Sequence, residues 1–341
     1  MLFYGFANIR INAYFCKQFY NGLTIHTRMM TSKTLIRQNS LKAWMLAARP
    51  KTLTGAAVPV LIATALALAD TQGEGFRALP DILCFLFAFI MQIDANFIND
   101  YFDFLKGNDD ETRLGPRRAC AQGWISLNAM KKAIVTTTAL ACLTGLPLIC
   151  YGGIEMILVG IVCIIFCFLY TTRLSYLGLG DVLVLVFFGI IPVCVTYYIV
   201  MPTSLHVPTS EVITASLTCG MVIDTLLIVN NYRDVNNDRR NGKCTLVVRI
   251  GTKASLNLYL LLGCATILQG GIFLMQGRIA SALLPVIYLI PHTFTWLRMR
   301  KIGKGKALNH ILGETARNIL FYGLLSALGL LADTFLFLTL A

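Results

Sequence analysis

The chain has few charged residues for its length, since Asp, Glu, Lys and Arg together make up 13% of its 341 residues. Hydrophobic residues make up 56%, a share that soluble globular domains do not usually reach. The sequence therefore predicts a polytopic membrane protein. Because the apolar segments recur without a soluble-looking interval between them, we expect one membrane domain rather than two domains.

Other absences limit the chemistry that the chain can carry. The 11 cysteines form no Cys-x-x-Cys pair and no ligand-like cluster, so the sequence indicates neither disulfides nor zinc. The four histidines lie outside the polar motifs, which argues against a histidine base or a catalytic triad. The net charge of +12 comes without a basic stripe interleaved with aromatic residues, so we expect no nucleic-acid partner.

The first part of the chain contains no acidic residue through residue 69, although it carries eight Lys and Arg residues. This composition resembles a transit peptide. A true start at Met29 or Met30 would explain it equally well. Under both interpretations we expect residues 1–39 to be an extension outside the core fold, and residues 40–341 to form the membrane domain.

The apolar segments that follow predict nine transmembrane helices. Their expected ranges are 52–70, 80–103, 131–151, 154–171, 181–201, 211–232, 255–275, 279–298 and 317–340. A short amphipathic helix over residues 40–50 is expected to precede them, lying at the membrane interface. This division places 27 of the 29 Lys and Arg residues on one side of the membrane. The positive-inside rule assigns that side to the cytoplasm or its equivalent, and the C-terminus to the opposite side.

Polar residues gather where the second predicted helix ends. If that helix continues, Asn96, Asp100 and Asp103 share one face at about 100° per residue, and Asn99 lies beside them. Carboxylate and amide oxygens suit Mg²⁺, which takes one or two carboxylates and leaves its other positions to water and substrate phosphates. The cations that follow would face the anionic part of the same ligand; they are Lys106, Arg113, Arg117 and Arg118. The alternative is a solvated loop of mixed charges, but polar groups at a helix end near the bilayer are costly and usually functional.

A second polar motif runs from residue 230 to residue 243, beginning at the end of the sixth predicted helix. Asp234 and Asp238 are four residues apart and therefore share a helix face. Three identities relate the two motifs at one offset of 131 residues: Asn99 with Asn230, Tyr101 with Tyr232, and Asp103 with Asp234. Two such clusters facing each other across a bundle could hold two Mg²⁺ ions with a diphosphate between them.

A transporter for an anionic solute, using the same cations, is the hypothesis from a different class of protein. Its ionisable groups would be expected near the membrane midplane, on broken helices. Only Asp94 and Asp224 lie that deep in the predicted helices. Both could equally be hydrogen-bonded groups that face the inside of the bundle.

At the two polar motifs the chain resembles the UbiA-type intramembrane prenyltransferases, whose motifs have the forms NDxxDxxxD and DxxxD. It is most similar to the branch that prenylates 1,4-dihydroxy-2-naphthoate in menaquinone synthesis, on the basis of residues 49–53, 99–104, 113–116, 230–234, 242–243 and 245–246. The chain departs from the general pattern at Gly107, where the last Asp of the first motif would fall. Carboxylates follow instead at Asp109 and Asp110, and Cys244 replaces a usual basic residue.

The resemblance implies an all-α fold, with nine transmembrane helices in a bundle around a central cavity and two Asp-rich motifs at cytoplasmic helix ends. It implies metal binding by Asn99, Asp103, Asp109, Asp234 and Asp238, with Mg²⁺ as the cofactor. The residues that it implies for catalysis are Asp103, Asp234 and Lys243. Those that it implies for substrate binding are Asn96, Arg113, Arg117, Arg173, Tyr232 and Arg233.

The implied reaction is an aromatic alkylation. A polyprenyl diphosphate ionises, the electron-rich naphthoate attacks the allylic cation, and the ring carboxylate is lost as CO₂, which gives demethylmenaquinone. Alternative acceptors are 4-hydroxybenzoate and homogentisate. We expect a bacterial inner membrane with the site facing the cytoplasm, or an organelle membrane if residues 1–39 are a transit peptide.

Overall fold

A computed structural model of the chain describes residues 36–107, 113–202 and 208–340, without the side chains of residues 336–340. Asp109 and most of the predicted extension lie outside these ranges. Every regular element in the described ranges is helical. Nine helices, some of them built from consecutive pieces, are long and apolar enough there to cross a membrane. The predicted all-α membrane fold is therefore confirmed.

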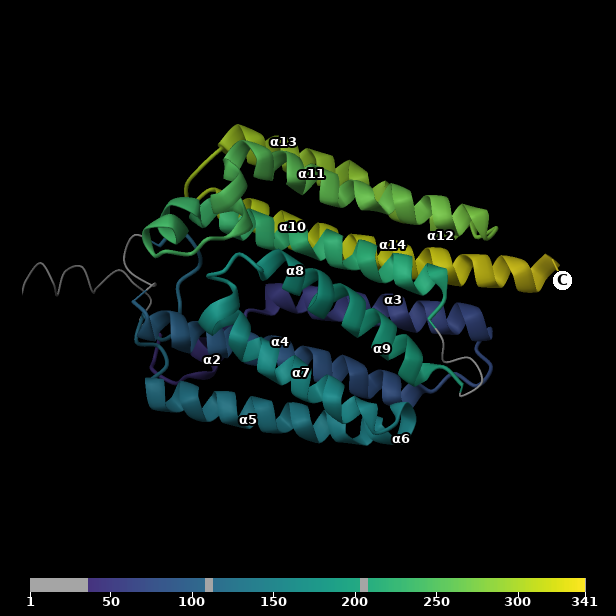
Figure 1. The fold of residues 1–341 in the computed structure, drawn as a ribbon, viewed down its shortest axis with the longest axis horizontal. Coiled ribbons are helices and arrows are strands. Elements are labelled where there is room, and N and C mark those ends of the chain that lie inside the picture. The colour runs from purple at the N-terminus through teal and green to yellow at the C-terminus, as the bar shows by residue number, and fades with distance from the viewer. Residues whose placement is uncertain (1–35, 108–112, 203–207, 341) are drawn as a thin grey trace, which may run out of the picture.

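The helices run roughly along one long axis and form an elongated bundle (Figure 1). In the first half the helices are α2 (Leu41–Ala48), α3 (Leu53–Thr71), α4 (Ala78–Leu105), α5 (Leu127–Gly145), α6 (Ile149–Gly152) and α7 (Glu155–Leu169). In the second half they are α8 (Gly180–Leu185), α9 (Ile191–Val200), α10 (Ser210–Arg240), α11 (Leu246–Met275), α12 (Ile279–Leu283), α13 (Leu289–Ile302) and α14 (Leu308–Leu340). Short 3-10 turns over Pro50–Thr52, Leu146–Leu148 and Pro285–Tyr288, and π-helical turns over Tyr170–Leu174 and Val186–Ile190, join pieces of these helices.

Local sequence explains where several helices begin and break. Ser126, Thr209 and Thr245 are the N-caps of α5, α10 and α11, and each side-chain oxygen accepts a hydrogen bond from a backbone N–H of the first turn. Helix α11 is interrupted at Gly251, whose φ of 82° and ψ of 164° are not helical. Glycine adopts this conformation without steric cost. The break separates a short segment near the polar end of the bundle from the long segment that crosses the membrane.

Helix α10 is longer than its apolar sequence predicts. The predicted range ended at residue 232, whereas the helix continues to Arg240. Only the predicted end of this helix is wrong, by eight residues; Asp234 and Asp238 lie on the helix, as their spacing predicts. Tyr232 and Arg233 are buried, so neighbouring helices cover α10 beyond the part that its hydropathy marks as a membrane segment.

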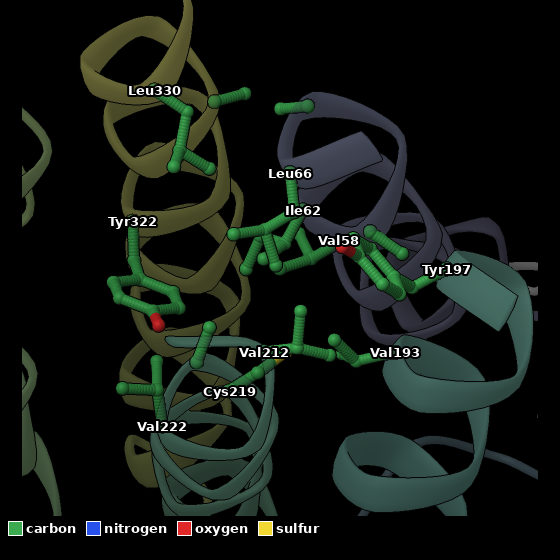
Figure 2. Packing of buried hydrophobic residues seen from close by; sticks show 14 of the residues in the cluster. Val58, Ile62, Leu66, Val193, Tyr197, Val212, Cys219, Val222, Tyr322 and Leu330 are labelled. Atoms are coloured by element: carbon green, nitrogen blue, oxygen red, sulfur yellow. The ribbon is translucent and has the colours of Figure 1, made fainter. Parts of the chain in front are cut away.

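The largest apolar core lies between α3, α9, α10 and α14 (Figure 2). Figure 2 labels Val58, Ile62 and Leu66 of α3, Val193 and Tyr197 of α9, Val212, Cys219 and Val222 of α10, and Tyr322 and Leu330 of α14. A Cβ atom at Gly323 would lie 2.8 Å from the Val58 side chain. A small residue at this position lets α3 and α14 pack closely, as is usual where membrane helices meet.

The two ends of the bundle differ in charge. Helices α4, α7, α10 and α13 all finish at one end of the bundle, while α14 finishes at the other (Figure 1). The first end carries both polar motifs, in agreement with the predicted division of the cations. At the opposite end Arg278 forms an ion pair with Asp70.

Candidate active site

The carboxylate of Asp103, near the end of α4, contacts a cation from each of two separate loops. Nη2 of Arg118 donates a hydrogen bond to Oδ2 of Asp103 over 2.7 Å, and both residues are buried. Nζ of Lys243, which follows α10, lies 3.6 Å from Oδ1 of the same carboxylate. The first motif therefore meets a residue of the second motif directly.

Asp100 has a structural role that its helical spacing did not predict. Its carboxylate accepts hydrogen bonds from the backbone N–H groups of Ala119, over 2.9 Å, and Cys120, over 3.0 Å. These bonds fix the loop that carries Arg118. These bonds favour an anchoring role for Asp100 over the metal-binding role that its shared helix face with Asp103 suggested.

Asn99 connects α4 to the π-helical turn after α7. Oγ1 of Thr171 donates to Oδ1 of Asn99 over 2.6 Å. In the same region Nζ of Lys106 donates to the carbonyl oxygen of Thr172 over 2.7 Å. Lys106 also lies 4.1 Å from the centre of the Tyr176 ring, and Lys243 lies 5.1 Å from it. Tyr176, which no motif identified, thus contacts one lysine that follows α4 and one that follows α10.

Arg233 and Asp234 form a two-point ion pair on α10. Nε and Nη2 of Arg233 donate to the two carboxylate oxygens of Asp234 over 2.9 Å and 2.6 Å. Nη1 of Arg233 donates to Oδ1 of Asn309 over 2.8 Å, and Nη2 donates to Oδ1 of Asn230 over 3.1 Å. Because its guanidinium is engaged within the protein, Arg233 orients Asp234.

Asn309 is a residue of the site that sequence reasoning missed. Besides accepting from Arg233, it donates through Nδ2 to the carbonyl oxygen of Leu114 over 2.8 Å. The last membrane helix was predicted to begin at residue 317, whereas α14 begins at Leu308. The first three turns of that helix carry Asn309, Glu314 and Arg317 among their apolar residues, so they do not read as a membrane segment, and only the assembled fold brings Asn309 to the second motif.

Asp238 completes the second motif one turn beyond Asp234. Its carboxylate is buried and lies within electrostatic range of Lys243, Asp234, Asp103 and Arg113. The carboxylates of both motifs and their cations therefore share one polar region. This region lies at the end of the bundle where α4 and α10 finish (Figure 1).

The other predicted substrate-binding residues differ in their environments. Arg113 is partly buried and donates through Nε to the carbonyl oxygen of Pro116. Arg117 and Arg173 are exposed. Tyr232 is packed in an apolar cluster. Of the two neighbouring arginines, Arg118 rather than Arg117 pairs with Asp103.

A cavity of about 540 Å³ opens beneath the polar region. Most of its lining is apolar and comes from α3, α4, α7, α9, α10 and the turns between them. The charged and amide-bearing residues of its lining are Arg49, Gln92, Asn96, Asn99 and Asn230. Asn99 and Asn230 are the first residues of the two motifs, so the cavity leads from the polar region into the apolar interior of the bundle.

The two deeper carboxylates predicted inside the membrane are not part of this cavity. Asp94 accepts hydrogen bonds from Thr137 and Thr138 of α5, and Asp224 is buried on α10. Neither residue lines the cavity.

The oxygen donors of the two motifs fit Mg²⁺ in chemical kind. Asn99, Asp103, Asp234 and Asp238 offer carboxylate and amide oxygens, the ligands that a hard cation prefers. Among the residues that the structure describes, no group of three or more His, Cys, Asp or Glu side chains could hold a metal ion by itself. A site of this kind relies on water and substrate phosphates for the remaining ligands, which is typical of Mg²⁺.

The fold and the paired polar motifs define an integral membrane protein of a known class. The UbiA prenyltransferase family matches residues 56–311, so the chain belongs to this family. It is 38% identical over 219 residues to 1,4-dihydroxy-2-naphthoate octaprenyltransferase of Escherichia coli (strain K12), over 62% of this chain and 69% of that protein. It is 36% identical over 231 residues to the enzyme of the same name from Haemophilus influenzae, over 65% of this chain and 73% of that protein.

Solved structures agree on the fold. A UbiA homolog from Archaeoglobus fulgidus, bound to DMAPP and Mg²⁺, superposes with a TM-score of 0.56 at 15% identity, covering 82% of this chain and 97% of that one. The membership of the chain in a family of prenyltransferases also decides between the two classes of hypothesis. The protein is an enzyme rather than a transporter.

Proposed function

We propose that this chain transfers a polyprenyl group from polyprenyl diphosphate to 1,4-dihydroxy-2-naphthoate, with release of diphosphate and CO₂. The observation that carries the proposal is the contact of Asp103 with Lys243. This contact joins the two motifs into one polar region, which lies above an apolar cavity. The names and the identities of the bacterial relatives support the choice of naphthoate as acceptor.

Mg²⁺ is the proposed cofactor, held by Asn99, Asp103, Asp234 and Asp238. When bound, it would neutralise charge on the diphosphate and so favour its departure. The Archaeoglobus fulgidus homolog with DMAPP and Mg²⁺ supports a divalent cation at this type of site. The ion pairs of Asp103 with Arg118 and of Asp234 with Arg233 hold these two carboxylates in fixed orientations.

The cations of the polar region would bind the diphosphate directly. Lys106 and Lys243 lie beside the Tyr176 ring, and Arg113 is within electrostatic range of Asp238. Positive charge fixed in this position stabilises the negative charge that develops on the leaving diphosphate. The exposed Arg117 and Arg173 would act at the rim of the same region.

Each bond that breaks in this reaction is matched by an electron pair that leaves or is reused. The C–O bond to the diphosphate breaks and its electron pair leaves with the diphosphate, while the ring supplies the pair for the new C–C bond. Loss of the carboxylate as CO₂ returns its bonding pair to the ring. The apolar cavity would take the isoprenoid tail and keep water from the allylic cation, which water would otherwise capture.

The orientation in the membrane follows from charge. The positive-inside rule assigns the Lys- and Arg-rich end of the bundle to the cytoplasm, so the site would take its substrates from that side of a bacterial inner membrane. The same end would face the equivalent compartment in an organelle membrane if residues 1–39 are a transit peptide. Cys244 is exposed at this end, so an impermeant thiol reagent should modify it only from the cytoplasmic side.

The direct test compares acceptors with purified protein in detergent, Mg²⁺ and a polyprenyl diphosphate. With 1,4-dihydroxy-2-naphthoate we expect a prenylated product together with diphosphate and CO₂. With 4-hydroxybenzoate or homogentisate we expect little product. A product formed only with one of these two acids would contradict the proposed acceptor. The absence of any covalent product with all three would contradict the proposed reaction.

A further inference from the structure

Arg49 combines an unusual backbone with an unpaired side chain. It follows α2 with φ of 50° and ψ of 69°, the left-handed conformation that non-glycine residues seldom adopt. Its side chain lines the cavity. Nη2 of Arg49 is shielded from solvent and has no hydrogen-bond partner in the described part of the chain. A buried guanidinium nitrogen in this state is costly unless a ligand pairs with it.

The carboxylates near Arg49 form their hydrogen bonds and ion pairs with other groups. Asp100 and Asp103 lie within its electrostatic range, but so do Arg113 and Arg118. Asp100 accepts two backbone N–H groups, and Asp103 pairs with Arg118 and Lys243. Among the residues that the structure describes, the charges that act most on Arg49 are therefore two cations and two anions.

The turn that carries Arg49 is tied to α4. Nδ2 of Asn96 donates to the carbonyl oxygen of Ala48 over 2.9 Å and to Oγ1 of Thr52 over 3.0 Å. Oγ1 of Thr52 in turn donates to the carbonyl oxygen of Arg49 over 2.9 Å. Asn96, predicted to bind substrate, thus fixes the backbone on both sides of Arg49. An unfavourable backbone conformation held this firmly is typical of a functional position.

We propose that Arg49 binds the carboxylate of the aromatic acceptor, an inference that rests on the proposed function. Arg49 belongs to the lining of the apolar cavity, whereas Asp103, Asp234, Asp238, Lys106 and Lys243 do not. We therefore place the diphosphate beside these five residues, outside the cavity. An aromatic acid fits the position of Arg49, because its flat ring suits apolar walls and its carboxylate matches the guanidinium fork in two-point pairing.

Binding of the acceptor's carboxylate by Arg49 would also make product release depend on the loss of CO₂. The substrate carries the carboxylate that Arg49 binds, whereas the prenylated quinol no longer has one. Decarboxylation therefore removes the ion pair that held the ring in place. We expect the neutral product to bind more weakly at this end of the cavity than the acid does, which favours its release into the bilayer.

The test measures binding in the absence of prenyl diphosphate, so that no reaction occurs. The probes are 1-hydroxy-2-naphthoate and 1-naphthol, which differ by the carboxylate, and their intrinsic fluorescence reports binding to the purified full chain. For a charge-assisted two-point pair, Arg49→Gln should weaken binding of the acid by roughly 10- to 100-fold. Binding of 1-naphthol should stay unchanged.

Two further variants keep the result interpretable. Arg49→Lys retains the charge but not the fork, and should bind the acid with intermediate affinity. Lys51→Gln removes an exposed cation from the same turn and should behave as wild type. A thermal midpoint for each variant checks folding. Equal weakening of both probes by a folded Arg49→Gln, or failure of the wild type to prefer the acid, would overturn the assignment.

Steady-state kinetics separate the acceptor from the diphosphate. In Arg49→Gln the KM for 1,4-dihydroxy-2-naphthoate should rise and the KM for the polyprenyl diphosphate should not. A rise confined to the polyprenyl diphosphate would move Arg49 to the diphosphate site and overturn this inference while leaving the proposed function intact. A wild-type chain that binds the acid through Arg49 yet does not prenylate naphthoate would contradict the proposed function alone.

Discussion

Nζ of Lys243 lies 3.6 Å from Oδ1 of Asp103, although the two residues belong to different halves of the chain. The pair joins the loop after α10 to the end of α4. Since Asp103 also pairs with Arg118, the carboxylate is held by cations from both motifs. This arrangement is the structural basis for treating the two motifs as one site.

Neutralising either motif carboxylate should remove activity. We expect Asp103→Asn and Asp234→Asn each to lower kcat by about three orders of magnitude, because the amide keeps the shape but not the charge. The double variant should be little worse than either single one, since residues that act together are not additive. Initial rates with purified protein provide the measurement.

Stability must be measured on the same samples, because the ion pairs of these residues matter to folding. Asp103→Asn removes the charge of the carboxylate that pairs with the buried Arg118, which we expect to lower the free energy of unfolding by up to several kcal/mol. Rates are therefore compared per folded molecule, together with thermal midpoints. Well-folded variants with near-normal rates would show that these aspartates serve only structural ion pairs.

Arg233 should act on turnover through Asp234. Arg233→Lys keeps the charge but cannot make the two-point pair with Asp234 and the bond to Asn309 together. We expect kcat to fall by about tenfold or more, with little change in the KM for polyprenyl diphosphate. Asn309→Ala is the matched control, because it removes the bonds of Asn309 to Arg233 and Leu114 but leaves the two-point pair of Arg233 with Asp234; it should have a smaller effect in the same direction. A large rise in that KM would instead favour direct diphosphate binding by Arg233.

Asp100 should matter to folding more than to metal binding. Asp100→Asn keeps one carbonyl oxygen for the N–H groups of Ala119 and Cys120 but replaces the other with a donor. We expect it to lower the free energy of unfolding by about 1–3 kcal/mol. The Mg²⁺ concentration that gives half-maximal rate should not change. An increase in that concentration would show that Asp100 is a metal ligand.

Residues before the described part of the chain should be dispensable for catalysis. A chain that starts at Met30 keeps Ser40, the N-cap of α2, and all of the site residues discussed above. We expect its rate in membranes to be nearly unchanged. A truncated chain that inserts normally but is inactive would contradict the assignment of residues 1–29 to an extension outside the core fold.

Hydrophobicity predicted the bundle because each membrane helix needs a long apolar segment, and that signal is strong. It could not predict that α10 continues to Arg240, since those residues are polar and are covered only once other helices pack around them. Helical spacing correctly grouped Asn96, Asp100 and Asp103 but could not show what each side chain contacts. The carboxylate of Asp100 accepts hydrogen bonds from backbone N–H groups, and the amide of Asn96 donates to the turn before α3.

Contacts made between distant segments were also beyond prediction. The resemblance selects Arg117 rather than Arg118 for substrate binding, whereas in the structure Arg117 is exposed and Arg118 is buried on the loop that Asp100 fixes. Asn309 belongs to no motif and becomes part of the site because α14 begins beside α10. The sequence shows Arg49 only as part of a motif. That its Nη2 is buried without a hydrogen-bond partner among the described residues becomes visible only in the fold.

The central claim is that the chain prenylates 1,4-dihydroxy-2-naphthoate with loss of its carboxylate. The most direct measurement uses naphthoate labelled with ¹⁴C in the carboxyl group, purified protein, Mg²⁺ and a polyprenyl diphosphate. We predict that labelled CO₂ and diphosphate are released in equal amounts, and that Asp103→Asn and Asp234→Asn abolish both. A prenylated product that keeps the label, or diphosphate released without labelled CO₂, would contradict the claim.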